Sequence, residues 1–421
     1  MQRITIVSAV YLPEPVVSAQ MTNDLAKHLV KLVQSVTVLC PQPSRSLNED
    51  YIQNNKSNFM FETNEEGIKV VRLPSFTASA SRLIPRLRES WSFGRHVCQY
   101  LATNGRLKPD VMYVNAWPLL AQALIMRYAS RNKIPVVLQI MDIYPESLIN
   151  KLPAIFRKCI SVPLTMLDAW IAQIARTVVV ISESMRRTYL ESRGIPPNRV
   201  VTIPTWQDEG MYESSPARMD VCRRYGMPEN LFTFLYLGNI GPVAGVGFLI
   251  QSFYEASIDS AQLLIVGEGS EKAACMKQAK KLNVANVHFI TDPDAANVPI
   301  LQSMAHVFML PLKQGAGRSS IPSKLPAYMF SSKPVIATVD LDSDTAQVIR
   351  QAKCGWVGEP EDLSWLVDKM REVAGLPKSE LERLGQLGKE YGLLHFSKSQ
   401  GVKQLSEVIM ESVSSHRCES L

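Results

Sequence analysis

Short runs of apolar, mostly β-branched residues alternate with longer segments of helical periodicity along the whole chain. In the first half these runs are Ile4–Val10, Val36–Cys40, Ile68–Leu73, Val111–Val114, Val136–Ile140, Val178–Ile181 and Val200–Ile203. The segments between them place apolar residues at helical spacing, as at Leu25, Leu29 and Leu32. Because nearly every residue of each run is apolar, the pattern predicts parallel strands buried between helices on both faces of a sheet.

The same pattern starts again in the second half of the 421-residue chain. Its runs are Phe232–Leu237, Leu263–Val266, Val287–Ile290, Val307–Leu310 and Val335–Val339. Pro204 and the polar segment 207–216 separate the halves. We therefore predict an α/β protein of two doubly wound, Rossmann-like domains, residues 1–204 and 205–395. The sequence leaves open whether a last helical segment, about residues 396–421, packs back on the first domain.

Composition and charge limit the class of protein. A charged fraction of 20% and a hydrophobic fraction of 46% are ordinary for a folded globular chain. The formal charge of +6 is too small to indicate a nucleic-acid partner, but it suits phosphorylated substrates or an anionic membrane surface. Seven scattered cysteines indicate reduced thiols in the cytoplasm. The most apolar stretch, Ile160 to Ile181, contains a proline and charged residues, so we predict a helix followed by a strand rather than a membrane span.

Glycine-rich loops follow the first two strands of the second half, at the edge where such sheets bind ligands. The first loop is Gly238-Asn239-Ile240-Gly241 and the second is Gly267-Glu268-Gly269. Glycines let the backbone approach a ligand, and the helix that follows each loop offers amides to a phosphate. The alternative is a tight turn without a ligand, in which Ser270 caps the following helix and Glu268 only belongs to the turn.

A third loop, residues 313–324, is rich in cations. It contains Lys313, Arg318 and Lys324 together with two glycines and hydroxyl groups such as Ser319, and Pro322 stands where a helix would start. Flexible backbone and cations before a helix make a suitable diphosphate cradle. A solvated basic loop is the alternative.

Acidic residues are candidates in two further places. Asp142 follows a strand of the first half, where a carboxylate could accept a sugar hydroxyl, orient an acceptor or cap a turn. Asp340, Asp342 and Asp344 alternate after a strand of the second half and could hold a metal, but near a helix start at Ser343 we favour capping. The six histidines form no cluster, so we predict no metal site.

Taken together, these segments resemble glycosyltransferases of the GT-B fold, most of all family 4, in the branch of fucosamine, colanic-acid and O-antigen transferases. The matching segments are 142–147 (Asp-Ile-Tyr-Pro-Glu-Ser), 178–185, 203–206 (Ile-Pro-Thr-Trp), 238–241, 266–269 and 322–325. The resemblance implies a cleft between the two domains, transfer with retention, and no metal or other cofactor.

The resemblance also implies roles for single residues. The second domain would bind a UDP- or GDP-linked sugar, and the first domain a polyprenyl-linked or saccharide acceptor for a bacterial surface polysaccharide (O-antigen, capsule or exopolysaccharide). Lys324 would neutralise the departing diphosphate, and Asp142 would serve the acceptor or the reacting sugar. The donor-binding set would be Gly238, Asn239, Gly241, Glu268, Gly269, Arg318, Ser319 and Lys324.

Three positions depart from the family pattern. The first loop reads Pro13-Glu14-Pro15 where adjacent glycines are usual, and no cation follows the glycine turn, at 242–246. The glutamate that grips the ribose is replaced by Ala327, and its partner position is Ser319. Two rival hypotheses therefore stay open: a non-catalytic homologue acting as a partner or regulatory subunit, and a sugar-nucleotide 2-epimerase.

One segment of the first domain suggests a membrane contact. Residues 82–95 mix four arginines with Trp91 and Phe93, and such a segment could lie on an anionic membrane. A helix packed on the sheet is the alternative. We expect a cytoplasmic protein, with peripheral contact at the inner face of the cell membrane as a further possibility.

Overall fold

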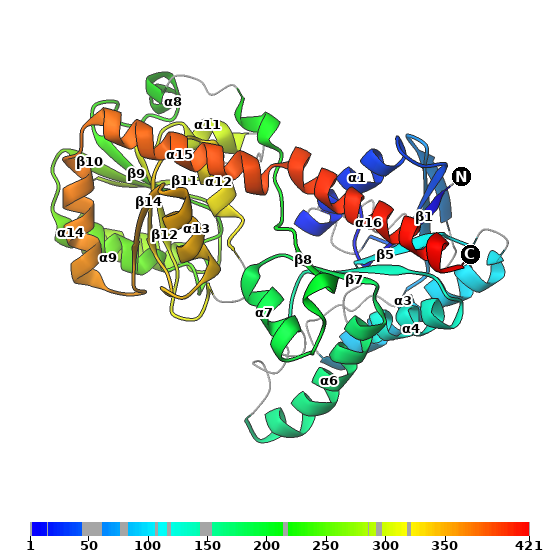
Figure 1. The fold of residues 1–421 in the computed structure, drawn as a ribbon. Helices are drawn as coiled ribbons and strands as arrows, with labels where there is room; N and C mark the ends of the chain where they lie inside the picture. The colour runs from blue at the N-terminus through cyan, green and yellow to red at the C-terminus, as the bar shows by residue number, and fades with distance from the viewer. Residues whose placement is uncertain are drawn as a thin grey trace. The chain divides into compact units, whose positions relative to one another are not determined.

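The computed structural model of the chain describes residues 2–14, 16–43, 61–75, 83–105, 108–115, 119–143, 154–213, 218–284, 286–291, 297–317 and 321–420. The chain divides into two compact units, Met1–Thr205 with Gly401–Leu421, and Trp206–Gln400. The C-terminal helix α16 (Lys398–Ser420) begins in the second unit and continues in the first. Each unit is a sheet covered by helices (Figure 1).

The first unit contains a sheet with the strand order β3-β4-β2-β1-β5-β6-β7-β8 over the described residues. The strands are β1 (Arg3–Ser8), β2 (Ser35–Pro41), β3 (Phe61–Glu65), β4 (Ile68–Leu73), β5 (Val111–Asn115), β6 (Val136–Ile140), β7 (Thr177–Val180) and β8 (Val200–Thr202). All pairs are parallel except β3–β4. Strand β3 was not predicted from the sequence, because its polar residues lack the apolar run of a buried strand.

Helices cover this first sheet. They are α1 (Val17–Leu29), α3 (Leu83–Thr103), α4 (Leu119–Arg131), α6 (Ala154–Ile174) and α7 (Glu183–Glu191). Helix α1 lies against β1 and β2, whereas α3, α4 and α6 pack one beside the next. The predicted helix and strand between residues 160 and 181 are confirmed as α6 and β7. Among the described helices, none is long and apolar enough to cross a bilayer.

Helix α3 contains most of the arginine-rich segment that the sequence singled out. Phe93 is buried, and Gly94 lies so close to α4 that a Cβ would be 2.8 Å from the Cα atom of Ala121. Trp91 is half exposed and stacks with the Arg95 guanidinium, 5.4 Å from its ring centroid. Within the described residues the segment is therefore a helix with one face packed on the unit and Trp91 on its exposed side.

The second unit contains a parallel sheet with the strand order β11-β10-β9-β12-β13-β14 over the described residues. The strands are β9 (Phe232–Leu237), β10 (Ala261–Val266), β11 (Val287–Ile290), β12 (Val307–Pro311), β13 (Val335–Thr338) and β14 (Gly355–Gly358). The helices are α8 (Arg218–Arg224), α9 (Val246–Ala256), α10 (Lys272–Lys281), α11 (Val298–Gln302), α12 (Lys324–Phe330), α13 (Asp344–Ala352), α14 (Leu363–Ala374) and α15 (Lys378–Phe396). Strand β14, four residues long with a glycine at each end, was not predicted from the sequence.

Alternation along the central strand β9 divides the core of this unit into two layers. Phe234 and Tyr236 pack with the residues of α9, α10 and α14. Leu235, between them, packs on the other face with α12 and α13. Since successive side chains of a strand point to opposite faces, a central parallel strand is buried on both sides and mostly apolar, as β9 is except at Thr233, whose hydroxyl accepts a hydrogen bond from Arg218.

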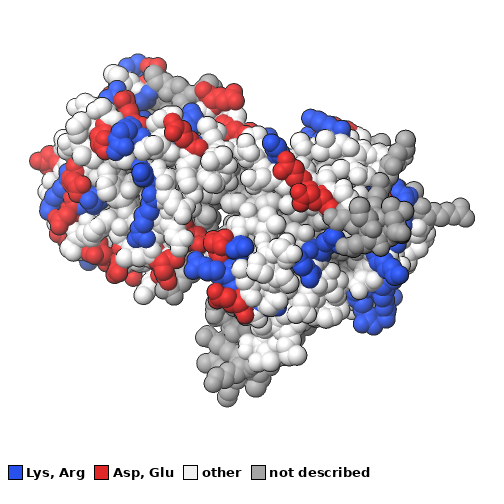
Figure 2. Space-filling view, in the orientation of Figure 1, with Lys and Arg blue, Asp and Glu red and all other residues white. Residues whose placement is uncertain are grey.

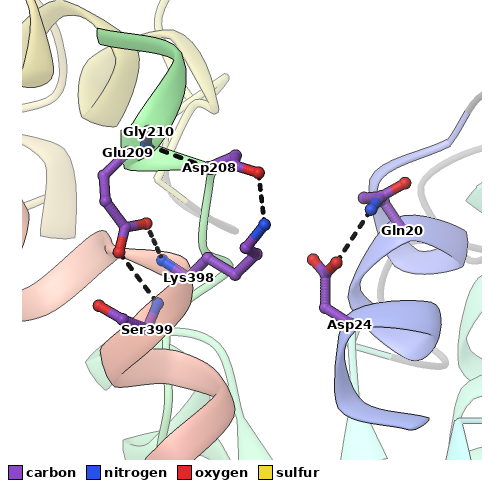
Figure 3. A network of polar contacts seen from close by, with 7 residues as sticks. All are labelled: Gln20, Asp24, Asp208, Glu209, Gly210, Lys398 and Ser399. Carbon is purple, nitrogen blue, oxygen red and sulfur yellow. Dashed lines mark hydrogen bonds and ion pairs between the residues drawn. The ribbon is translucent and has the colours of Figure 1, made fainter. Parts of the chain in front are cut away.

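A polar network holds the start of α16 (Figure 3). The Glu209 carboxylate accepts hydrogen bonds from the backbone N–H groups of Lys398, at 2.7 Å, and Ser399, at 3.2 Å. The Lys398 ammonium also donates to Asp208. Burial alone would raise the pKa of Glu209, but these hydrogen bonds lower it. The carboxylate thus satisfies amides that the first turn of a helix cannot pair internally.

Candidate functional site

The glycine loops of the second unit lie at the carboxyl ends of β9 and β10, which are neighbours in the sheet. The two loops are bonded to each other, because Gly238 N–H donates to Val266 O at 2.9 Å and Ile240 N–H donates to Glu268 O at 2.7 Å. Gly269 (φ +154°) lies against the first loop, so that a Cβ there would be 2.2 Å from Ile240 O and 2.7 Å from Asn239 Oδ1. The structure therefore brings these predicted donor-binding residues together.

Lys324, the first residue of α12, extends across Gly238. A Cβ on Gly238, whose φ is +143°, would lie 2.3 Å from the Lys324 Cε atom. Glycine is needed here both for the backbone conformation and for the passage of the lysine chain. Lys324 and the loop after β9 are thus in contact, which the sequence did not show.

Tyr236 contacts the Lys324 ammonium with both its hydroxyl and its ring. The ammonium donates to the Tyr236 hydroxyl and stands 4.2 Å from the centroid of its ring. The hydroxyl in turn donates to Asn239 O at 2.6 Å. The side chain of Tyr236 therefore links the lysine to the glycine loop. The sequence analysis did not name this residue, since a tyrosine in an apolar strand gives no signal beyond core packing.

Burial controls the charge of this site. It lowers the pKa of Lys324 to about 8 and raises the pKa of Tyr236. Burial disfavours the charged form of an ammonium, and an incoming anion would offset that cost. Tyr328, one turn after Lys324, anchors the same strand end, because its hydroxyl donates to Leu237 O at 3.1 Å and accepts from Leu237 N–H at 3.0 Å.

Glu268 lies at the exposed rim of the second loop. Its carboxylate accepts from the Lys272 ammonium at 2.6 Å and from the Thr291 hydroxyl at 2.8 Å. These hydrogen bonds, the first of them above all, lower the pKa of Glu268. Ser270 does not cap the helix that follows, since the N-cap position of α10 is Glu271. Lys272 and Thr291 are contacts that the sequence analysis missed.

The cation-rich third loop is described only in part. Arg318 and Ser319 lie outside the described residues. Before them, Gly315 N–H donates to both oxygens of Asp340, at 2.9 and 3.1 Å. The N-cap of α13 is Ser343, which accepts from Ala346 N–H at 3.2 Å, and not one of the acids expected to cap the helix; of these, Asp344 lies in the first turn. Within the described ranges, no three His, Cys, Asp or Glu side chains group as metal ligands would.

Asp142 lies in the first unit, two residues after β6 and therefore at the carboxyl end of that sheet. It is partly buried. Residues 144–147, which complete its motif, are outside the described ranges. The loop after β1, where the sequence has prolines in place of the family's adjacent glycines, is held by Arg72, whose guanidinium donates to Leu12 O at 2.7 Å.

The position of the missing ribose-binding glutamate is buried. Ala327 is 6% exposed and packs in the layer of α12 and α13. It lies one turn after Lys324 on the same helix. The described residues therefore place a methyl group where the family pattern has a carboxylate.

These features define a class and then a family. Two Rossmann-like units, with glycine loops and a lysine at the carboxyl ends of the strands of the second, are those of the GT-B fold. The family "Glycosyl transferase 4-like domain" matches residues 18–206, and "Glycosyl transferases group 1" matches residues 222–391. The chain belongs to the family 4 glycosyltransferases and is a transferase enzyme.

Known proteins agree with this assignment. The chain is 24% identical to WcaI of Escherichia coli (strain K12), described as a colanic acid biosynthesis glycosyl transferase, over 87% of this chain and 91% of the relative. Anabaena HepE, solved in complex with UDP, superposes with a TM-score of 0.69 at 14% identity over 98% of this chain and 100% of its own. Sucrose-phosphate synthase of Thermosynechococcus elongatus gives 0.70 at 17% identity over 99% and 100%. These structural likenesses show the GT-B fold.

Proposed function

We propose that the protein transfers a sugar from a nucleotide-diphosphate donor to a lipid-linked or saccharide acceptor during synthesis of a bacterial surface polysaccharide. The observation that carries the proposal is the position of Lys324 across Gly238 at the strand ends. The description of WcaI as a colanic acid transferase and the UDP bound by HepE support the pathway and the donor class.

Each group of the site has a task in this reaction. Gly238 lets the loop backbone come close to the donor, the amides of Asn239 and Gly241 contact the diphosphate, and Lys324 neutralises the charge that grows on it as the bond to the sugar breaks. This ammonium supplies locally the positive charge that metal-dependent transferases take from a cation, so we propose transfer without a metal ion. Glu268 and Gly269 line the nucleoside side.

The remaining predicted residues complete the proposal. Arg318 and Ser319 add contacts to the phosphates, and Asp142 accepts a hydroxyl of the acceptor or of the transferred sugar. We propose transfer with retention of configuration, as in the family that the sequence resembles. We place the reaction in the cytoplasm, at the inner face of the membrane, where a lipid-linked acceptor presents its sugar.

The test is a titration with UDP- and GDP-linked sugars, followed by a transfer assay with the donor that binds. We expect Lys324→Met to abolish turnover while the unfolding temperature changes little. Lys333→Met is the matched control, since burial also lowers the pKa of Lys333, which lies beyond the C-terminus of α12. Equal turnover of Lys324→Met and the wild type, or no binding of any donor, would refute the proposal.

A second candidate is a homologue without catalysis, and Ala327 favours it. Losing a carboxylate that makes charge-assisted bonds to ribose weakens donor binding by about 1.5–3 kcal/mol. If the wild type binds no nucleotide and Ala327→Glu does, the site has decayed and the protein serves as a partner subunit. If the wild type binds and turns over the donor, this candidate is excluded.

A further inference from the structure

The Tyr236 hydroxyl can bind the Lys324 ammonium in one direction only. It donates its single proton to the Asn239 carbonyl oxygen, at 2.6 Å, so only its lone pairs face the lysine. The ammonium has protons but no lone pair, and it donates to this hydroxyl. Because a hydrogen bond from an ammonium is stronger than one from a neutral amine, the hydroxyl favours the charged form of the lysine.

The hydroxyl itself is held at a fixed point between the strand and the loop. The peptide group that receives its proton is bonded on the other side as well, because Ile240 N–H donates to Glu268 O at 2.7 Å. The ring of Tyr236 is fully buried and packs with the residues of α9, α10 and α14. Neither the acceptor for the ammonium nor the loop peptide can therefore rotate without breaking a second contact.

The lysine side chain is confined from two sides. Its Cε atom lies where a side chain of Gly238 would begin, 2.3 Å from the position of a Cβ. Its ammonium stands 4.2 Å from the centroid of the Tyr236 ring. A lysine on a flexible four-carbon stem ordinarily samples many conformations. Here that freedom is already lost before a ligand arrives, and a charge that is placed in advance stabilises a transition state best.

The surroundings of Lys324 differ from those of the surface cations of the second unit. On the visible face of this unit, Lys and Arg side chains lie mixed with Asp and Glu (Figure 2). A pair such as Arg383 and Glu380 is exposed on both sides. Lys324 is half-buried, and it meets a phenol hydroxyl and an aromatic ring. The phenol therefore supplies a partner for a cation that is withdrawn from water.

Two titratable groups interact with Tyr236 from neighbouring elements, Cys275 of α10 and Tyr328 of α12. Burial raises the pKa of both, so both are neutral in the range where Lys324 titrates. Further titratable groups act on these two, and they are Glu271, Lys313 and Tyr212. Burial is the cause that lowers the pKa of Lys324, and the Tyr236 hydroxyl acts against it.

We propose that Tyr236 is a positioning residue for the transfer, whose hydroxyl and ring hold the Lys324 ammonium at the strand ends, directed toward the place where charge grows on the departing diphosphate. Because Tyr236 is fully buried, it acts through Lys324 rather than on the donor. The inference rests on the proposed function, since the ammonium needs a diphosphate to act on. A tyrosine that only filled the core would do so equally well without its oxygen, and this difference separates the two roles.

The first measurement needs no donor. In protein labelled with ¹³C at the lysine Cε atoms, the signal of Lys324, assigned by its loss in Lys324→Met, reports its protonation between pH 6 and 10. Tyr236→Phe keeps the ring and removes the acceptor, so the midpoint should fall by about one pH unit from the wild-type value of about 8. Tyr328→Phe is the matched control, since its hydroxyl is also buried at this strand end but bonds to Leu237. Its midpoint should equal that of the wild type.

The second measurement is transfer at pH 6, where the lysine stays protonated in each protein. Tyr236→Phe should lower kcat roughly 10- to 100-fold, because a displaced ammonium is lost mainly from the transition state. The dissociation constant of the donor should change less than about threefold. Tyr212→Phe, at a buried tyrosine that packs on Phe330, should keep the kcat of the wild type.

An unchanged midpoint or an unchanged kcat in Tyr236→Phe, with the variant folded by circular dichroism, would overturn the inference. It would also be overturned if the midpoint fell as far in Tyr328→Phe, since the loss of any buried hydroxyl would then explain the shift. If the midpoint moves as expected but the wild type binds no sugar nucleotide, the positioning of Lys324 is supported and the transfer reaction is refuted.

Discussion

The pKa of Lys324 predicts how donor binding changes with pH. The two phosphate groups of a sugar nucleotide carry constant charge above neutral pH, so a change in the attraction between these groups and the protein must come from the protein. Burial lowers the pKa of Lys324 to about 8, and the protonated form is the one that attracts the diphosphate. Affinity should therefore be constant below this pKa and fall as the pH rises through it.

The size of the effect follows from the protonated fraction. With a pKa near 8, roughly nine-tenths of the lysine is protonated at pH 7 and about 3% at pH 9.5, so the dissociation constant should rise roughly 30-fold. A lysine with its ordinary pKa near 10.4 would change the constant by less than about 1.2-fold over the same range. The two cases are easily separated.

Isothermal titration with the bound donor between pH 7 and 9.5 measures this profile. The wild type should show the rise, Lys333→Met should show the same rise, and Lys324→Met should bind weakly with little dependence on pH. A flat wild-type profile, or an unchanged slope in Lys324→Met, would refute the link between Lys324 and the phosphates.

Three further predictions concern the framework of the two units. Gly238→Ala and Gly267→Ala impose similar backbone strain, at φ +143° and +141°, but the first Cβ meets the end of the flexible Lys324 side chain, whereas the second meets a backbone oxygen at 2.1 Å. Circular dichroism should show that Gly238→Ala folds and that Gly267→Ala does not. In a donor titration, Gly238→Ala should not bind. Burial, with nearby cations, lowers the pKa of His306 from 6.5 to about 4, so between these pH values the unfolded chain binds a proton on His306 that the folded chain does not. The free energy of unfolding should therefore fall by roughly 3 kcal/mol as the pH is lowered from 6.5 to 4. His306→Gln should remove this part of the pH dependence. Arg193 Nε donates to the buried Asp168 carboxylate at 2.8 Å. Arg193→Met leaves Asp168 buried without its cation and should cost about 3–5 kcal/mol in urea unfolding.

The sequence predicted the α/β architecture because buried parallel strands need apolar residues on both faces. The strands that it missed, β3 and β14, are short edge strands, one polar and one bounded by glycines. A strand at an edge needs only one bonded neighbour and less burial, so its sequence is weakly constrained. The path of α16 from one unit to the other depends on contacts such as that of Glu209, and no local pattern encodes it.

For the site, the sequence predicted which loops lie at the strand ends but not which atoms touch. The glycines and Lys324 are visible as a pattern, since they depart from the apolar background. The role of Tyr236 could not be predicted from the sequence, because a tyrosine on β9 fits the apolar core whether or not its hydroxyl accepts a hydrogen bond from a lysine. Such a contact between residues 88 positions apart follows only from the packing of α12 against the strand.

A carboxylate at position 327 is expected to change the pKa of Lys324, which burial lowers. In the usual family pattern a carboxylate stands one turn after the lysine, where it would stabilise the ammonium and raise its pKa. Here a buried methyl group takes that place, so no carboxylate at position 327 opposes desolvation. Ala327→Glu should therefore move the pH at which donor affinity falls from about 8 toward the ordinary lysine value, even where the affinity at pH 7 changes little. An unchanged midpoint in the same titration, with the variant folded by circular dichroism, would show that the two residues are independent.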